Sequence, residues 1–313
     1  MLSAHAIVLE QPERLSLRAI ELTQPGPDDV VVDIEWTGVS TGTERLLYSG
    51  QMPVFPGMGY PLVPGYETVG RIAGGARSGE RVFVPGAQCF GEIRGLFGGS
   101  ASRLVVPSAR AVAIDEHLGD RGALMALAAT AYHAIASGSG ALPQLIVGHG
   151  VLGRLIARIA TALAAERGAA APVVWETNAA RRAGAEGYQV VHPMDDDRRD
   201  YAVICDVSGD SEILDTVIAC LAPGGEIVLA GFYSKPLGFA FPPAFMREAR
   251  IRIAAEWKPA DLTAAAVLIA DGRLSLDGLI THRMEAGQAE SAYRTAFEDP
   301  DCLKMIMDWR AFS

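Results

Sequence analysis

The sequence predicts an α/β protein in which a β-rich domain precedes a doubly wound parallel sheet. From about residue 122 onward, short apolar runs alternate with helical patterns, which is typical of right-handed βαβ units. The first clear run, Leu145-Ile146-Val147, leads into Gly-His-Gly-Val-Leu-Gly, and a helical pattern follows at once. A G-x-G-x-x-G motif between a strand and a helix is the dinucleotide fingerprint of a Rossmann domain.

The position of the fingerprint predicts how the chain is divided. A chain of 313 residues has room for roughly two domains. Residues 1–121 contain short strand candidates, such as 30–34 and 81–84, separated by Pro/Gly turns. We expect this part, with residues 274–313 packed back onto it, to form a β-rich substrate and catalytic domain. The Rossmann dinucleotide-binding domain then spans residues 122–273.

Six strands would complete the Rossmann sheet. The strand candidates are 144–148, 172–176, 189–191, 202–207, 226–231 and 251–255. Helical patterns between them include 154–167 and 211–221. The tail after residue 273 has one strand-like piece, 279–280, and two short helical pieces. Residues 50–65 are too rich in Pro and Gly for regular structure, and a loop of this length is usually functional.

Composition excludes several classes of function. The net charge of −10 and the absence of a Lys/Arg run argue against a nucleic-acid partner. Residues 122–153 carry no charged side chain, but His133, Pro143 and several glycines interrupt the run, so we expect a buried helix and strand and not a membrane span. The N-terminus shows no secretion signal. The scattered cysteines predict neither a disulfide framework nor a structural zinc site, so we expect a cytoplasmic protein.

The fingerprint and the strand ends predict a cofactor site. Gly148 makes the tight turn, Gly150 lets the backbone approach a pyrophosphate, and Gly153 permits close packing of helix and sheet. Glu176 ends the second strand, where an acid binds the ribose hydroxyls and favours NAD over NADP. Arg181 and Arg182 leave an alternative open, because they could reach a 2′-phosphate. The remaining cofactor candidates are His149, Val151 and Leu152 in the fingerprint and Ser208 and Gly231 at later strand ends. For His149, the alternative is a turn residue that contributes only its backbone.

The order of the domains resembles the medium-chain dehydrogenase/reductase superfamily, in which a GroES-like catalytic domain precedes a Rossmann domain. Within it, segments along the whole chain resemble the bacteriochlorophyllide a dehydrogenases, which oxidise the 3-(1-hydroxyethyl) group of a magnesium tetrapyrrole to acetyl. The similar segments are WTGVSTGTE, FPGMGYPLVPGYE, RGLFGGSASRLVVP, LIVGHGVLGR, VVWETNAARRAGA, GGEIVLAGFY, FAFPPAFMREARIRIAAEW, LITHR and CLKMIMDW. The resemblance implies NAD-dependent oxidation in bacteriochlorophyll a biosynthesis.

The resemblance does not extend to the zinc ligands of the alcohol dehydrogenases. Their first Cys falls at Ser40 or Thr41, their G-H-E motif has Tyr66 in place of His, and their third ligand falls near Ala126. Neither Thr nor Tyr is a usual zinc ligand, and Ala cannot be one, so we expect no catalytic metal. Cys89 and Glu67 could belong to some other site.

Without zinc, a positioned base or a hydrogen-bond relay must take the proton of the alcohol. The candidates are Tyr66, Thr41, Thr43, Glu67 and His133, with Glu44 as a runner-up that is more often structural. A Tyr can act as the base only if a neighbour lowers its pKa, and a Thr can only relay a proton. A single His in an apolar run, such as His133, is more often a core residue than a catalytic one.

A tetrapyrrole needs a wide apolar site, and aromatic and Met side chains on three loops could line it. The substrate candidates are Met52, Phe55, Phe90, Phe97, Phe232 and Tyr233, although many such side chains are ordinary core residues. The segment 239–245 adjoins the sixth strand, whose edge pairs with a second subunit in related enzymes, so we expect a homodimer. The rival functions are a zinc-free NAD(P)H quinone or enoyl reductase and a non-catalytic pigment carrier.

Overall fold

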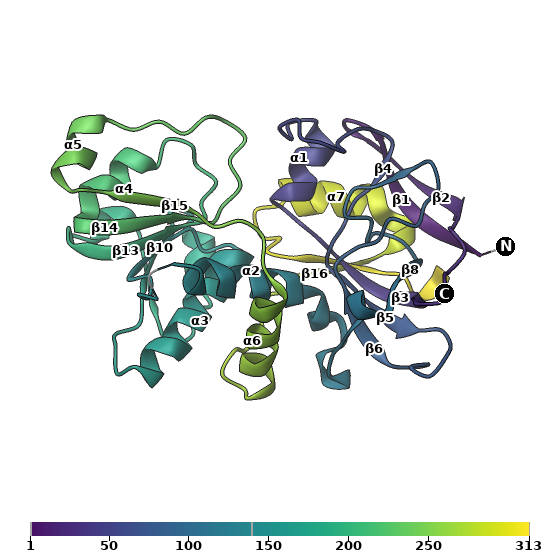
Figure 1. Cartoon of the computed structure of the whole chain (residues 1–313). Coiled ribbons are helices and arrows are strands. Elements are labelled where there is room, and N and C mark those ends of the chain that lie inside the picture. Colours follow the sequence, from purple (N-terminus) through teal and green to yellow (C-terminus); the bar gives the residue numbers. More distant parts are fainter. Residues whose placement is uncertain (1, 139, 313) are drawn as a thin grey trace. The chain divides into compact units, whose positions relative to one another are not determined.

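The computed structural model describes residues 2–138 and 140–312, and the chain divides into two compact units (Figure 1). Unit 1 comprises Met1–Ala126 and Leu279–Ser313, and unit 2 comprises Leu127–Gly278. No helix in the described part of the chain is both long and apolar enough to cross a membrane. All four cysteines are buried free thiols.

Unit 2 is a doubly wound domain built on a parallel sheet of the kind the alternating pattern predicts. In the described residues the strand order is β12-β11-β10-β13-β14-β15, and every neighbouring pair is parallel. The strands are β10 Leu145–Val147, β11 Val173–Trp175, β12 Gln189–Val191, β13 Tyr201–Asp206, β14 Leu221–Leu229 and β15 Arg250–Ile253. This order, 3-2-1-4-5-6 in chain sequence, is that of the Rossmann fold, whose ligands bind at the carboxyl ends of the strands.

Helices cover both faces of this sheet, with α3 on one face and α4 and α5 on the other (Figure 1). The helices are α2 Met125–Ala136, α3 Val151–Glu166, α4 Leu214–Cys220, α5 Phe241–Met246 and α6 Pro259–Ala270. Helix α3 begins three residues earlier than the predicted 154–167, because Gly150 is its N-cap and the fingerprint itself forms the first turn. Helix α4 is shorter than the predicted 211–221. Strand β14 starts at Leu221, so Pro223-Gly224-Gly225, which the sequence predicts as a turn before the fifth strand, lies inside an irregular strand.

Unit 1 is β-rich, and its longest strand, β3, organises a mixed sheet. In the described residues this sheet has the order β16-β17-β3-β5-β6-β9, with β8 also paired to β3, and a second sheet has the order β2-β1-β4-β7. The strands are β1 Ser3–Gln11, β2 Arg14–Glu21, β3 Asp29–Val39, β4 Leu62–Val63, β5 Thr68–Ile72, β6 Arg81–Val84, β7 Arg94–Gly95, β8 Arg103–Pro107, β9 Val112–Ala113, β16 His282–Glu285 and β17 Met305–Asp308. The helices are α1 Thr43–Ser49 and α7 Ala289–Glu298.

The tail differs from the sequence prediction. The predicted strand at 279–280 does not form, and two strands that were not predicted, β16 and β17, join the sheet of unit 1. Strand β17 pairs antiparallel with β3, and the indole of Trp309 donates to Thr37 Oγ1 at 2.9 Å. Leu279 is buried without strand pairing, so its apolar character reflects packing and not a sheet.

Short 3₁₀ helices complete the described elements. They span Ser108–Arg110, Glu116–Leu124, Ala179–Arg182, Pro193–Asp195, Ala286–Gln288 and Arg310–Phe312. Of the loop predicted at 50–65, only Leu62–Val63 forms a strand, so the rest is irregular, as its Pro/Gly content indicates.

Candidate dinucleotide site and hydroxyl cluster

The three glycines of the fingerprint turn between β10 and α3 have different structural roles. Gly148 has φ +103°, a conformation that a side chain would strain. A Cβ on Gly153 would lie 2.0 Å from the carbonyl oxygen of Gly148, so only glycine lets α3 approach the strand this closely. A Cβ on Gly150 would meet nothing within 4 Å. The space above Gly150 is therefore open, as a pyrophosphate beside the backbone requires.

The N-terminus of α3 adds an electrostatic reason for an anion to bind. The N-cap, Gly150, has no side-chain cap, and the first turn contains no acidic residue. Helix N-termini carry unsatisfied N–H groups and the positive end of the helix dipole. Val151 and Leu152 contribute backbone to this turn; the Val151 side chain itself is buried. Their predicted cofactor role is therefore a role of the main chain.

Glu176 lies where its spacing predicts, directly after β11 and beside the fingerprint. Its Oε2 accepts the N–H of His149 at 3.0 Å, and its Oε1 accepts the N–H of Asn178 at 2.7 Å. A carboxylate has about four acceptor positions, so two remain after these bonds. The carboxylate is thus held in place by two backbone donors and can still accept from two ribose hydroxyls.

The carboxyl ends of β10, β13 and β14 come together around the fingerprint. A Cβ on Gly148 would lie 3.2 Å from the backbone of Ser208, and one on Gly231 would lie 3.4 Å from the N–H of Gly209. Ser208 is exposed and donates its N–H to Asp206, the buried residue that ends β13. The structure therefore groups Ser208 and Gly231 with the fingerprint at one edge of the sheet.

Tyr233 differs from the expectation that it faces substrate. Its hydroxyl bonds to the buried carboxylate of Asp206. Burial, together with the negative charge of Asp206, raises the pKa of Tyr233 well above its ordinary range. The hydroxyl is therefore committed to a contact inside unit 2, whereas the neighbouring Phe232 is 50% exposed and free to meet an apolar ligand.

His149 is a predicted cofactor residue whose ring has hydrogen-bond partners inside unit 2. Its ring is fully buried, with Nδ1 2.6 Å from the carbonyl oxygen of Arg181 and Nε2 2.8 Å from the hydroxyl of Tyr188. The ring thus points into the unit, and only the backbone of His149 belongs to the fingerprint turn. The alternative prediction, that His149 contributes only its backbone, fits the turn. It did not include the two hydrogen bonds of the ring.

In unit 1, the hydroxyl groups of Ser40, Thr43 and Tyr66 lie close together. Ser40 and Tyr66 are at or next to positions that the sequence comparison with zinc-dependent alcohol dehydrogenases aligns with metal ligands. The Tyr66 hydroxyl lies 2.8 Å from Ser40 Oγ and 3.5 Å from Thr43 Oγ1, so the three form a hydroxyl cluster. Thr41 is exposed beside it. No group of three or more His, Cys, Asp or Glu that could hold a metal occurs among the described residues. Neutral hydroxyls are poor zinc ligands, so this donor set does not fit a catalytic zinc.

The electrostatics of the hydroxyl cluster oppose one predicted role of Tyr66. Burial raises the pKa of Tyr66 well above its ordinary value, and the nearby carboxylates of Glu67 and Glu44 raise it further. No neighbour lowers it enough to give a phenolate near neutral pH. Tyr66 is therefore suited to pass a proton between hydroxyls and unsuited to act as an ionised base.

Glu67 is fully buried and forms an ion pair with Lys304. Lys304 was not among the residues predicted from the sequence. Lys304 also donates to the carbonyl oxygen of Val39 at 3.0 Å. A Cβ on Gly38 would collide with both side chains of the pair, so a glycine is required there. Burial raises the pKa of Glu67, and Lys304 opposes this rise. Glu67 is thus occupied by a structural partner, which weakens its case as a free base.

Glu44, on the first turn of α1, is a second buried carboxyl group next to the cluster. Its Oε1 accepts the N–H of Ser40 at 3.2 Å, and its Oε2 accepts the hydroxyl of Tyr293 at 2.6 Å. Burial raises the pKa of Glu44 to about 7, against the opposing effect of the Tyr293 bond. A carboxyl group with this pKa suits proton exchange at neutral pH.

Two further candidates have structural partners. His133 Nδ1 lies 2.8 Å from Asp261 Oδ2, and Asp261 also accepts the N–H of Lys258 in the capping box of α6. His133 thus ties α2 to α6 inside unit 2, which is the core role that its apolar setting favours. Cys89 lies in the core of unit 1, where its sulfur accepts the N–H of Val105.

The predicted substrate side chains of unit 1 separate into two groups. Met52 and Phe90 are buried in its hydrophobic core, so they pack and do not present a surface. Phe55 and Phe97 are half-buried. The ring of Phe97 packs edge-on against Tyr66 with the centroids 5.2 Å apart, so Phe97 is the aromatic candidate that adjoins the hydroxyl cluster.

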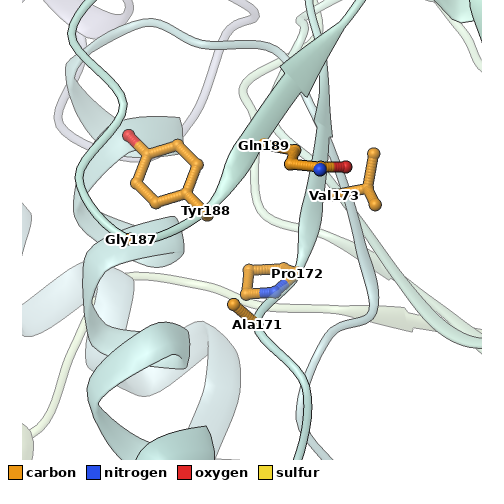
Figure 2. Close-up of a pocket in the computed structure, with 6 residues that line it drawn as sticks. All are labelled: Ala171, Pro172, Val173, Gly187, Tyr188 and Gln189. Atoms are coloured by element: carbon orange, nitrogen blue, oxygen red, sulfur yellow. The ribbon is translucent and has the colours of Figure 1, made fainter.

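A pocket of about 340 Å³ in unit 2 lies away from the fingerprint. Its lining comes from the amino ends of β11 and β12 and the residues before them, Ala171–Val173 and Gly187–Gln189 (Figure 2). Dinucleotides bind at the opposite, carboxyl ends of such strands. The pocket therefore does not mark the cofactor site.

Comparisons with known proteins agree with this architecture. No protein-family model matches the chain. An alcohol dehydrogenase of Escherichia coli complexed with NADH superposes with a TM-score of 0.81 at 22% identity, covering 98% of this chain and 99% of the other. The acetophenone reductase of Geotrichum candidum in complex with NAD superposes with a TM-score of 0.80 at 17% identity, covering 98% and 97%. At these identities the likeness establishes the fold.

A β-rich unit joined to a Rossmann unit with this fingerprint defines a medium-chain dehydrogenase/reductase. The 2-desacetyl-2-hydroxyethyl bacteriochlorophyllide A dehydrogenase of Cereibacter sphaeroides is 57% identical over 98% of both chains. The protein of the same name from Rhodobacter capsulatus is 55% identical over 99% of both chains. The chain belongs to the family of 2-desacetyl-2-hydroxyethyl bacteriochlorophyllide A dehydrogenases, which confirms the resemblance seen in the sequence.

Proposed function

We propose that the chain oxidises the 3-(1-hydroxyethyl) group of a bacteriochlorophyllide to a 3-acetyl group, with NAD as the hydride acceptor, in bacteriochlorophyll a biosynthesis. The observation that carries this proposal is 57% identity, over nearly the whole chain, to a dehydrogenase whose name states that substrate. The rival functions are less well supported. A pigment carrier has no use for the fingerprint and Glu176, and an NADPH-dependent reductase would not hold a carboxylate at the ribose position.

The residues at the carboxyl edge of the Rossmann sheet fit NAD. The open space at Gly150 and the uncapped N-terminus of α3 suit the pyrophosphate, and Glu176 keeps two acceptor positions for the ribose hydroxyls. The oriented carboxylate also repels a 2′-phosphate, which favours NAD over NADP. NAD bound there supplies the acceptor for the hydride that leaves the hydroxyethyl carbon.

We assign proton removal to the chain's own groups and not to zinc, because the hydroxyl cluster does not fit that metal. As the carbon loses a hydride with its electron pair, the alcohol oxygen must lose its proton. Tyr66, Ser40 and Thr43 are close enough to relay a proton between hydroxyls. Thr41 is the exposed neighbour of this cluster. Glu44 has a pKa of about 7, and the backbone N–H of Ser40 holds its carboxylate beside the cluster. That N–H positions Glu44 and does not pass a proton, so the proton must reach Glu44 directly from a cluster hydroxyl; with this step Glu44 is our candidate for the final acceptor at neutral pH.

The substrate is a planar magnesium tetrapyrrole, and the exposed or half-buried aromatic side chains are best placed to contact it. We retain Phe55, Phe97 and Phe232 as substrate candidates. Phe97 has the strongest support, because it packs against Tyr66. We withdraw Met52, Phe90 and the hydroxyl of Tyr233, because each is committed to packing or bonding within its own unit.

We propose further that the protein is a cytoplasmic homodimer that pairs through β15. Among the described residues β15 is paired on one side only, with β14. Exposed apolar side chains lie on β15 and on the helix before it: Phe241, Phe245, Met246, Ile251 and Ile253. Strand β15 has only four residues, but its two exposed isoleucines and the apolar side chains of α5 form an apolar patch at an unpaired edge, so a partner strand is expected there.

The proposed reaction can be tested with the protein, NAD and the hydroxyethyl pigment. A new carbonyl conjugated to the macrocycle must shift the long-wavelength absorption band as NADH appears. The pigment without NAD, and NAD without the pigment, serve as controls. A pigment that binds but stays unchanged with NAD would support a carrier, and oxidation of NADPH by a quinone or an enone would support the reductase.

A further inference from the structure

The ring of His149 has a defined hydrogen-bonding state. Its Nδ1 lies against the carbonyl oxygen of Arg181, which can only accept, so Nδ1 carries the hydrogen. Its Nε2 therefore accepts a hydrogen bond from the hydroxyl of Tyr188. Burial lowers the pKa of His149 to about 4, so the ring is neutral at pH 7. The two contacts join the fingerprint turn to the segment that connects β11 and β12, residues 177–188, which we call the connecting segment.

Arg154 makes a second set of contacts between the same two parts. It follows Gly153 on α3, and its buried guanidinium donates to the carbonyl oxygens of His149 at 3.1 Å, Arg181 at 3.1 Å and Gly184 at 3.4 Å. Gly184 has φ +82°, and a Cβ there would lie 2.3 Å from the guanidinium. The connecting segment is thus held against the fingerprint by the imidazole of His149 and the guanidinium of Arg154. Further along α3, Arg158 adds an ion pair with Glu186 of the same segment at 2.6 Å.

The same histidine also controls the orientation of Glu176 through its backbone. The N–H of His149 is one of the two donors that hold the Glu176 carboxylate, and the other comes from Asn178 in the connecting segment. If the ring loses its partners, both donors can move. Arg181 and Arg182 lie on the same segment, so its release would also let two guanidinium groups change position.

We propose that His149 is a positioning residue for nucleotide selection: by binding Arg181 and Tyr188 it fixes the connecting segment and, through its own N–H, the carboxylate that prefers a free 2′-hydroxyl to a 2′-phosphate. This inference rests on the proposed use of NAD. It differs from the general role of the ribose-binding acid, because the selecting group here is held by a side chain that does not touch the cofactor.

The test compares the affinities for NAD and NADP of the full-length protein, by calorimetry without pigment. One hydrogen bond of this kind is worth a factor of roughly three to ten in an equilibrium constant. We expect His149→Ala to lower the preference for NAD over NADP by about tenfold. His149→Asn, whose amide can donate near the position of Nδ1, should recover most of the preference. The matched control is His192→Ala, a half-buried histidine of the same unit whose ring caps a short helix.

The chain should fold without the ring, because the carbonyl oxygen of Arg181 keeps its bond from Arg154. Tyr188→Phe gives a second result, because it removes the hydroxyl that donates to Nε2 of His149 and that also bonds to Arg158. ¹⁵N NMR of the wild-type protein should show the Nδ1–H tautomer. Tyr188→Phe keeps the carbonyl oxygen of Arg181 and so should keep this tautomer, but it should lower the preference for NAD, because Nε2 loses the hydroxyl that fixes the ring.

The inference is overturned if His149→Ala, or Tyr188→Phe should the first variant not fold, keeps the wild-type preference. It is also overturned if the wild-type ring is the Nε2–H tautomer, or if His149→Asn is no better than His149→Ala. A wild-type chain that binds no NAD would overturn the proposed function as well, so the two failures can be told apart.

Discussion

At the scale of single residues, the hydroxyl cluster shows how a site of this fold can lack metal ligands and keep polar groups. Tyr66 stands where zinc-dependent relatives have a histidine, and its hydroxyl binds Ser40 Oγ at 2.8 Å. Because burial raises the pKa of Tyr66, its value to the reaction lies in relaying a proton and not in ionising. This shifts the search for a base towards Glu44, whose pKa is about 7.

The Tyr66→Phe variant tests the relay. We expect kcat to fall by roughly 10²-fold, in the range for loss of a proton-transferring group, while KM changes little. Steady-state kinetics with the pigment and NAD measure both constants. Tyr48→Phe is the matched control, because Tyr48 is a half-buried tyrosine of unit 1 whose hydroxyl donates a long bond, 3.3 Å, to the carbonyl oxygen of Glu13 and lies outside the cluster. A kcat equal to that of the wild type would remove Tyr66 from the mechanism.

The buried pair of Glu67 and Lys304 gives a second prediction at this scale. Removing one member of a buried ion pair costs about 3–5 kcal/mol, because the other charge stays buried. We expect Lys304→Met to lower the free energy of unfolding by about this amount, and Glu67→Gln combined with Lys304→Met to recover part of it. Urea unfolding measures both variants.

The pH dependence of the Lys304→Met variant follows from Glu67. Without Lys304 the pKa of Glu67 rises further above its unfolded value, so the native state holds a proton that the unfolded state releases. The stability of the variant, relative to the wild type, should therefore fall as pH rises above 4.5. If the variant and the wild type differ in the free energy of unfolding by the same amount at acidic and at neutral pH, then the pKa of Glu67 does not rise when Lys304 is removed.

At the scale of elements, the turn from β10 into α3 combines folding and binding in six residues. Gly153 serves the packing of helix on strand, whereas Gly150 faces open space. The close packing at Gly153 was predictable, because the fingerprint is local and each glycine has one defined place in it; the pyrophosphate contact of Gly150 stays a prediction. The direction of the His149 ring was not predictable, because its partners, Arg181 and Tyr188, follow 32 and 39 residues later in a segment without a recognisable pattern.

Alanine substitutions at Gly153 and at Gly150 test the packing role and the binding role separately. Gly153→Ala should destabilise the protein by about 1–3 kcal/mol, since its Cβ must displace the backbone of Gly148. Gly150→Ala should leave stability nearly unchanged and weaken NAD binding, since its Cβ enters the space meant for the pyrophosphate. Thermal unfolding and NAD titration distinguish the outcomes. Tight NAD binding by Gly150→Ala would place the cofactor elsewhere.

The tail shows what the sequence could not predict about elements. Strands β16 and β17 are four residues each, too short for a clear alternation, and β17 pairs with β3, which lies far away in the sequence. Lys304 lies beside β17 and reaches Glu67 only through this pairing. The sequence shows only that Lys304 lies in an apolar segment, and this does not identify Glu67 as its partner. Contacts of this kind depend on the three-dimensional fold and leave no local pattern.

At the scale of the whole molecule, the edge of the Rossmann sheet predicts self-association. Ile251 and Ile253 are exposed on β15, which is paired on one side only among the described residues. We expect the wild type to sediment as a dimer and Ile253→Lys, which places a charge on the edge, to sediment as a monomer. Val267→Lys, at an exposed position on α6, is the control and should remain dimeric. A monomeric wild type would contradict the proposed pairing.

The central claim is that this chain transfers a hydride from the hydroxyethyl group of a bacteriochlorophyllide to NAD without zinc. The most direct measurement follows NADH and acetyl pigment together, by absorption, in protein treated with a strong chelator. The account predicts one NADH for each acetyl group formed, at the rate of the untreated protein. Acetyl pigment without NADH, or a rate that is lost and returns only when zinc is added, would contradict it.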